Sequence, residues 1–237
     1  MSYLLALLII GITILFHEFG HLVFAKMIKM PINIFSVGFG PKLLSKKIGK
    51  TEYRLSMIPL GGYVMPAIED EKEFFEIPVY KRVIMSIGGP IASIILPIFC
   101  FSLINTFTMD FSLWALTVKP ILQAGQLFIG MAASLPQIFS GQGEVAGIVG
   151  IISQGGQIIE SSIFNSLKFA ALISLNFALL NLLPLPILDG GKILLYLMEK
   201  VSVKFKKVHY PLTLASWVLI IGLMVYVTVL DVSKLIA

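Results

Sequence analysis

The chain has 237 residues, of which 57% are hydrophobic and only 13% are charged, and its mean hydropathy is +0.93. Soluble domains carry about 25% charged residues, so this composition excludes an ordinary soluble protein and predicts an integral membrane protein. The net charge of +5 does not indicate a partner nucleic acid, because the basic residues gather in the connections between apolar stretches.

Four apolar stretches are long enough to cross a bilayer, which takes about 20 helical residues. We predict an all-α integral membrane protein with about four transmembrane helices, and a small membrane-associated β-hairpin or sheet after the first. The whole chain, residues 1–237, is expected to form a single domain. The predicted spans cover residues 3–24, 83–107, 169–188 and 210–230. Ten of the eighteen basic residues lie between the first and second spans, so this connection is expected on the cytoplasmic side, with both termini extracytoplasmic.

The first span contains the sequence HEFGH at residues 17–21. On a helix His17 and His21 lie one turn apart on the same face, so both imidazoles can bind one Zn²⁺ while Glu18 projects toward water held there. Each ionisable side chain inside a membrane costs roughly 2.5–3.5 kcal/mol and usually has a functional reason. The alternatives are polar side chains that satisfy one another or lie at the interface, and a signal peptide, for which no basic n-region or cleavage site is present. The spacing is typical of zincin metalloproteases.

Residues 34–64 are the one region with strand character. Residues 53–58 alternate between polar and apolar side chains and are bounded by Gly49 and Gly61. A small sheet or hairpin is predicted there, and the alternative is an interfacial loop with a short amphipathic hairpin.

A third metal ligand must come from elsewhere in the chain, and Asp189 is the best candidate. It is the only acidic residue in or at the end of the third predicted span. Pro184 and Pro186 break that helix, and irregular backbone at membrane depth is tolerated only where protein or a water-filled cavity satisfies it. We therefore expect the broken segment to bring Asp189 to the metal. The alternative is a simple turn, in which Asp189 caps a helix that begins near Lys192.

Taken together, these motifs resemble those of the site-2 proteases, which are intramembrane zinc metalloproteases, and the bacterial sigma-factor-pathway group is the most similar. The resemblance is carried by HEFGH, by the pattern N-x-x-P-x-P-x-x-D-G at residues 181–190, and by the sequences GGPIA and GGYV at residues 88–92 and 61–64.

The resemblance implies a role for several residues. It implies that His17, His21 and Asp189 hold one Zn²⁺ per chain, that Glu18 is the general base, and that Asn181 holds the substrate backbone. It also implies that the edge of the β region, here involving some of residues 53–58, receives an unwound substrate as an added strand.

One departure from the family pattern concerns the connection between the second and third spans. Bacterial relatives commonly insert one or two PDZ domains there, and residues 108–168 leave no room for one. Access of substrates is then expected to depend on this segment, on a partner or on an earlier cleavage.

The expected function is zinc-dependent hydrolysis of peptide bonds within or near the transmembrane segment of a membrane protein, such as a membrane-anchored regulator. The resemblance implies a bacterial cytoplasmic membrane. The topology from the basic residues predicts that the active site lies toward the cytoplasm. The bilayer and the substrate are the expected partners, and no nucleic acid is expected. Two alternatives stay open: a membrane metal-ion carrier that uses the same three ligands and does not need Glu18, and a catalytically silent chaperone or scaffold.

Overall fold

The structure is a computed structural model. It describes the whole chain except residues 69–70, 109–111, 140–145, 160–161, 203 and 237, and except the side chains of residues 59–60, 71–72, 138–139 and 234–236. Four helices in the described part are long and apolar enough to cross a membrane: α1 (Ser2–Met27), α3 (Val79–Thr108), α6 (Ile163–Asn181) and most of α8 (Lys204–Ile236). The prediction of a helical membrane protein with four spans and a small sheet after the first is confirmed.

The third span differs from its predicted bounds of 169–188. Helix α6 begins at Ile163 and ends at Asn181, and residues 182–188 form turns rather than helix. The reason is proline chemistry: Pro184 and Pro186 lack the N–H that a helix needs, and each disfavours the helical conformation of the residue before it. The irregular segment leads directly into helix α7 (Asp189–Val201).

The chain folds into two compact units, which we describe separately. One unit comprises residues 1–10, 94–179 and 214–237 and includes η1 (Trp114–Val118), α4 (Lys119–Phe139) and α5 (Ile148–Ile159). Its core joins α3, α4 and α6 through a buried cluster of Cys100, Phe101, Ile104, Ala124 and Ala171. The described elements between α3 and α6 are all helices, and no PDZ domain is indicated.

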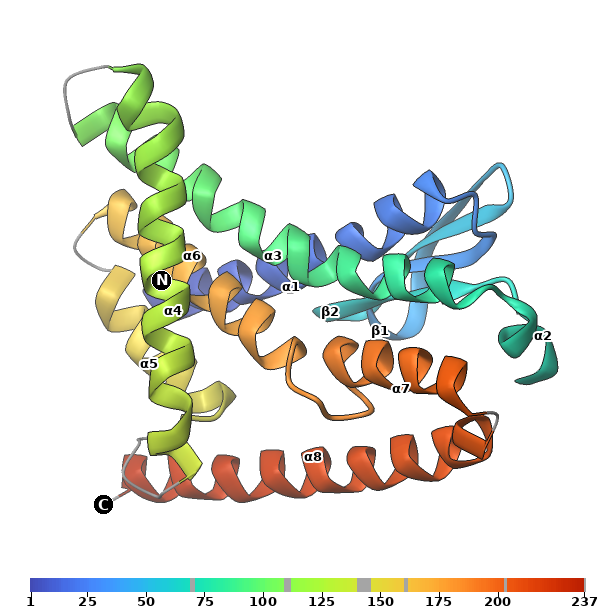
Figure 1. Cartoon of the computed structure of the whole chain (residues 1–237). Helices are drawn as coiled ribbons and strands as arrows, with labels where there is room; N and C mark the ends of the chain where they lie inside the picture. The colour runs from blue at the N-terminus through green and yellow to red at the C-terminus, as the bar shows by residue number, and fades with distance from the viewer. Residues whose placement is uncertain (69–70, 109–111, 140–145, 160–161, 203, 237) are drawn as a thin grey trace. The chain divides into compact units, whose positions relative to one another are not determined.

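The other unit comprises residues 11–93 and 180–213. It holds strands β1 (Ile32–Ile48) and β2 (Thr51–Pro66), the short helix α2 (Glu71–Glu76) and α7 (Figure 1). A buried cluster ties α1 to the sheet, and it consists of Leu22, Ala25, Met30, Ile32 and Phe35. This packing fixes the sheet beside the helix that carries the HEFGH sequence.

The register of the sheet shows which backbone is free. Residues 42–48 pair with residues 51–56 through a hairpin turn at Gly49, which has a φ of +62°. Residues 34–37 have partners on both sides, residues 52–55 and residues 62–65. Among the residues that the structure describes, the free edges of this sheet are therefore residues 42–48 and 62–66.

This register corrects the expected edge strand. Tyr53 pairs with both Phe35 and Lys46, and Arg54 pairs with both Ser36 and Ser45. An edge strand adds a partner through unpaired N–H and C=O groups, and a strand with neighbours on both sides has none to offer. The prediction was that some of residues 53–58 take part in the receiving edge, and residues 53–55 are excluded from that role.

Candidate metal centre

Helix α1 presents His17 and His21 toward α3 because the two helices approach closely. Gly20 of α1 faces Gly88 of α3, and a side chain at either position would overlap the other's backbone. Small residues allow membrane helices to bring their backbones together in this way. The imidazoles on the same side of α1 therefore lie directly against α3.

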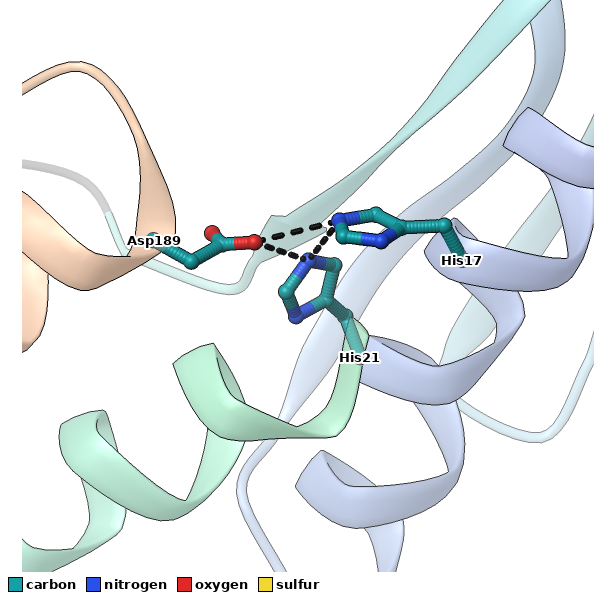
Figure 2. A group of neighbouring side chains, drawn as sticks. All are labelled: His17, His21 and Asp189. Atoms are coloured by element: carbon teal, nitrogen blue, oxygen red, sulfur yellow. Dashed lines mark hydrogen bonds and ion pairs between the residues drawn. The ribbon is translucent and has the colours of Figure 1, made fainter. Parts of the chain in front are cut away.

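The structure brings His17, His21 and Asp189 together, although Asp189 is 172 residues from His17 in sequence (Figure 2). The His17 Nε2 and His21 Nε2 atoms lie 3.1 and 3.2 Å from Oδ2 of Asp189, and 3.2 Å from each other. All three residues are buried, with exposed fractions of 4%, 8% and 3%. Asp189 is the first residue of α7, so the break after α6 carries it to the histidines.

Helix α3 holds the far side of both imidazole rings. The Nδ1 of His17 lies 2.9 Å from the Ser93 hydroxyl, and the Nδ1 of His21 lies 2.8 Å from the Met85 carbonyl oxygen. A carbonyl oxygen only accepts, so the His21 Nδ1 donates to it, and its Nε2 is the nitrogen that faces Asp189. Such partners orient metal-binding histidines and fix their tautomer. Sequence reasoning missed both contacts, because a single serine or a backbone carbonyl on another helix has no recognisable pattern.

The three residues fit a zinc ion. Tetrahedral zinc with bonds of about 2.0–2.1 Å places neighbouring ligand atoms about 3.3 Å apart, close to the observed separations of 3.1–3.2 Å. A Cβ added to Gly89 would overlap the Nε2 atoms of both imidazoles, so this glycine keeps the metal-facing side of the rings clear. Two imidazoles and one carboxylate form a donor set typical of zinc, and they leave a fourth position for water.

The charge of Asp189 also suits a metal ligand. Burial raises the pKa of this carboxyl group, but hydrogen bonds from the two imidazoles outweigh burial and hold the pKa well below its usual range. Its second oxygen, Oδ1, lies 3.3 Å from the Lys192 ammonium group, one helical turn further along α7. Asp189 is therefore an anion whose Oδ2 faces the imidazoles while its Oδ1 is held by a cation.

The two remaining predicted residues lie outside this three-residue group. Glu18 is half-buried, and its side chain lies against the free sheet edge: a Cβ on Gly62 would stand 3.4 Å from Cγ of Glu18. Asn181 is half-buried and is the last residue of α6, immediately before the irregular segment that leads to Asp189. The contact between Glu18 and the sheet was not predicted.

Several known proteins are similar in sequence to this chain. A relative from Chlamydia pneumoniae is 38% identical over 151 residues, covering 54% of this chain and 24% of the relative. One from Treponema pallidum is 33% identical over 134 residues, covering 50% and 30%. One from Fusobacterium nucleatum is 23% identical over 337 positions, covering 99% of both chains. The name of each relative begins "Putative zinc metalloprotease".

The relatives differ from this chain in length. The match covers about a quarter of the Chlamydia pneumoniae protein, and the Fusobacterium nucleatum alignment contains at least 100 positions without a counterpart among the 237 residues here. The sequence model of peptidase family M50 nevertheless matches residues 5–225, which include the histidine pair, the sheet and the segment that ends at Asp189. The chain therefore belongs to peptidase family M50.

Proposed function

We propose that this multi-pass membrane protein is a zinc-dependent intramembrane endopeptidase that cleaves membrane proteins within or near a transmembrane segment. The observation that carries the proposal is the buried group of His17, His21 and Asp189, with Glu18 next to the first histidine, in a chain of peptidase family M50. The three side chains hold one zinc ion per chain. The metal-carrier alternative is not favoured, because the matching family is a peptidase family.

The chemistry divides between the ion and Glu18. Zinc, when bound, polarises a peptide carbonyl and lowers the pKa of water toward neutrality. The Glu18 carboxylate takes a proton from the attacking water and later passes it to the leaving amine. Burial of the site excludes bulk water, which strengthens these electrostatic interactions.

The substrate backbone needs a holding surface, because a carbonyl in a helical hydrogen bond is shielded from attack. We assign this role to the free edge at residues 62–65 of β2, where an unwound segment can add as a strand and regain backbone hydrogen bonds. This edge suits the role because Gly62 lies against Glu18. Asn181 is proposed as a second contact to the substrate backbone.

The membrane arrangement follows from charge. The basic residues between α1 and α3 and at the start of α8 support a cytoplasmic location of those connections, with both termini extracytoplasmic. We propose that the membrane is a bacterial inner membrane. The zinc site then faces the cytoplasmic side, and the substrate is a membrane-anchored regulator or a similar single-span protein. The lipid bilayer is the second partner, and nucleic acid is not one.

The test is cleavage of a tagged single-span substrate by the full chain in liposomes. Glu18→Gln should retain wild-type zinc content and lose cleavage by about 10²–10⁴-fold, which is the usual contribution of a general base. Glu76→Gln is the matched control, because Glu76 is exposed on α2, and it should cleave at the wild-type rate. Equal cleavage by Glu18→Gln and wild type would refute the assignment of the base. Zinc flux into the liposomes without cleavage would support the carrier instead.

A further inference from the structure

Helix α7 carries four polar residues along one stripe: Asp189, Lys192, Tyr196 and Glu199. Their spacing of three, four and three residues places them on the same face of a helix. Asp189, Tyr196 and Glu199 are all buried. The stripe therefore begins at the metal centre and ends at a buried carboxylate on the last turns of the helix.

The carboxylate at the far end, Glu199, is bound by Arg82 of α3. The guanidinium donates from Nη1 to Oε1 at 3.0 Å and from Nη2 to Oε2 at 2.6 Å. The two side chains are only 2% and 1% exposed. The remaining Nε–H of Arg82 donates to the Ile77 carbonyl oxygen at 3.1 Å. This bidentate geometry allows a single orientation of the two groups, because both planes are fixed.

Aromatic rings pack around the same guanidinium. Its central carbon lies 4.7 Å from the ring centroid of Tyr196 on α7, and 4.9 and 5.6 Å from those of Phe74 and Phe75 on α2. His209 of α8 stacks on Tyr196, with ring centroids 5.8 Å apart and planes 6° apart. Helices α2 and α8 thus enclose the pair in addition to its own two helices, and they shield it from solvent.

Stability alone does not account for a pair of this kind. Taking two charges out of water costs about as much as their attraction returns, and replacing a buried ion pair by apolar side chains of similar volume is often neutral or stabilising. What a fully bonded pair supplies is one specific arrangement of the elements that carry it. For α3 and α7, that arrangement is the rotation of α7 about its own axis.

The metal centre depends on this rotation. Residues 182–188 before α7 are irregular and pack against Gly190 and Gly191 at its first turn, and the Arg82–Glu199 pair holds the same helix at its other end. A side-chain oxygen lies about 5 Å from the axis of its helix, so a rotation of about 5° displaces it by about 0.4 Å. Metal ligands tolerate only about 0.2 Å. Helix α3 contacts both the metal centre and the far end of α7. It carries Arg82, which binds Glu199, and also the Ser93 and Met85 groups that hold the histidines.

We propose that Arg82 and Glu199 are positioning residues of the metal centre, ten residues along α7 from Asp189. The pair holds α7 in the rotation that presents Oδ2 of Asp189 to the two imidazoles. The inference rests on the proposed function only in taking zinc as the bound metal. It assigns the pair no contact with substrate.

The test uses the full chain with Arg82→Met and Glu199→Leu together, which removes both charges and keeps similar side-chain volume. The double variant should fold, bind zinc at least about 10-fold more weakly in competition with a chelator, and shift the visible absorption bands of the Co²⁺-loaded protein. Those bands report the number and geometry of the ligands. The charge-matched control is Lys42→Met with Glu52→Gln, which removes an exposed ion pair of the sheet and should leave both readouts unchanged.

Wild-type zinc affinity and an unchanged Co²⁺ spectrum in the double variant would overturn the proposal. If the double variant does not fold, the isosteric Glu199→Gln is measured in the same two ways, and an unchanged spectrum again overturns it. Both readouts are taken without substrate. A protein that loads zinc normally but cleaves nothing would therefore refute the proposed function and leave this inference standing.

Discussion

Helix α7 has a buried carboxylate at each end, and the two differ in what surrounds them. Glu199 faces the guanidinium of Arg82, a permanent cation that meets both of its oxygens. Oδ2 of Asp189 faces two imidazoles, which carry charge only when they are protonated. The Glu199 end is thus balanced by the protein alone. At the Asp189 end Lys192 balances Oδ1, and we propose that a metal cation completes the balance at Oδ2. The chemistry of the partners, rather than burial itself, separates a structural carboxylate from one that can bind a metal.

The largest effect on zinc binding is expected when Asp189, at the first turn of α7, loses its charge. Asp189→Asn keeps the shape of the side chain and removes the anion, so zinc affinity should fall by at least about 100-fold, more than the loss of an outer partner costs. Cleavage of the test substrate should fall below detection. Zinc content after dialysis against a chelator gives the measurement.

Asp231→Asn serves as the control for that variant. Asp231 is also a buried aspartate, but it accepts a hydrogen bond from the Gly150 N–H at 2.8 Å in the other unit. The variant should keep its zinc. Loss of zinc from both variants to the same extent would contradict the special role of Asp189.

At the Arg82–Glu199 pair, a single substitution should lower the free energy of unfolding more than a double substitution does. Arg82→Met alone leaves Glu199 buried without its cation, which should destabilise the protein by about 3–5 kcal/mol. Arg82→Met with Glu199→Leu should recover most of that loss. Unfolding by denaturant in detergent measures both. A single variant as stable as the double variant would show that Glu199 is not held as a buried charge.

The outer partner of His17 is expected to have a smaller effect. Ser93→Ala removes the hydroxyl at Nδ1 and should weaken zinc binding by about 10–100-fold, with little change in the melting temperature. Ser102→Ala lies on the same helix, bonded to the Leu116 carbonyl, and should retain wild-type affinity. Equal zinc affinity in the two variants would mean that the hydroxyl does not orient the ring.

The smallest effect is expected at Arg54 and Glu52, a second guanidinium–carboxylate pair that is only partly buried. Arg54, and then Lys42, lower the pKa of Glu52 from 4.5 to about 2. The folded-state pKa is the lower one, so the contribution to stability is complete above about pH 4.5 and is lost as the pH falls toward 2. Arg54→Met should move the Glu52 pKa back toward 4.5, by more than Lys42→Met does. Titration of a ¹³C-labelled carboxyl group by NMR checks this order.

The sequence by itself determined the four spans, the strand region and most of the candidate site. Apolar length fixed four spans, because a membrane helix must satisfy its backbone internally over a known thickness. Helical spacing placed His17 and His21 on one face, since residues four apart are neighbours on any helix. Asp189 was predicted because it is the only acidic residue at the end of the broken third span. These inferences depend on local geometry, which the order of residues dictates.

The tertiary structure decided everything that joins distant segments. The Ser93 contact to His17 spans 76 residues and the Arg82–Glu199 pair spans 117. No sequence pattern around the serine or the arginine identifies its partner. The segment predicted to contain the receiving edge includes interior residues, because residues 52–55 can be known as interior only once residues 34–37 lie beside them. Contacts of this kind follow from how helices and strands pack against one another, and packing depends on the whole chain at once.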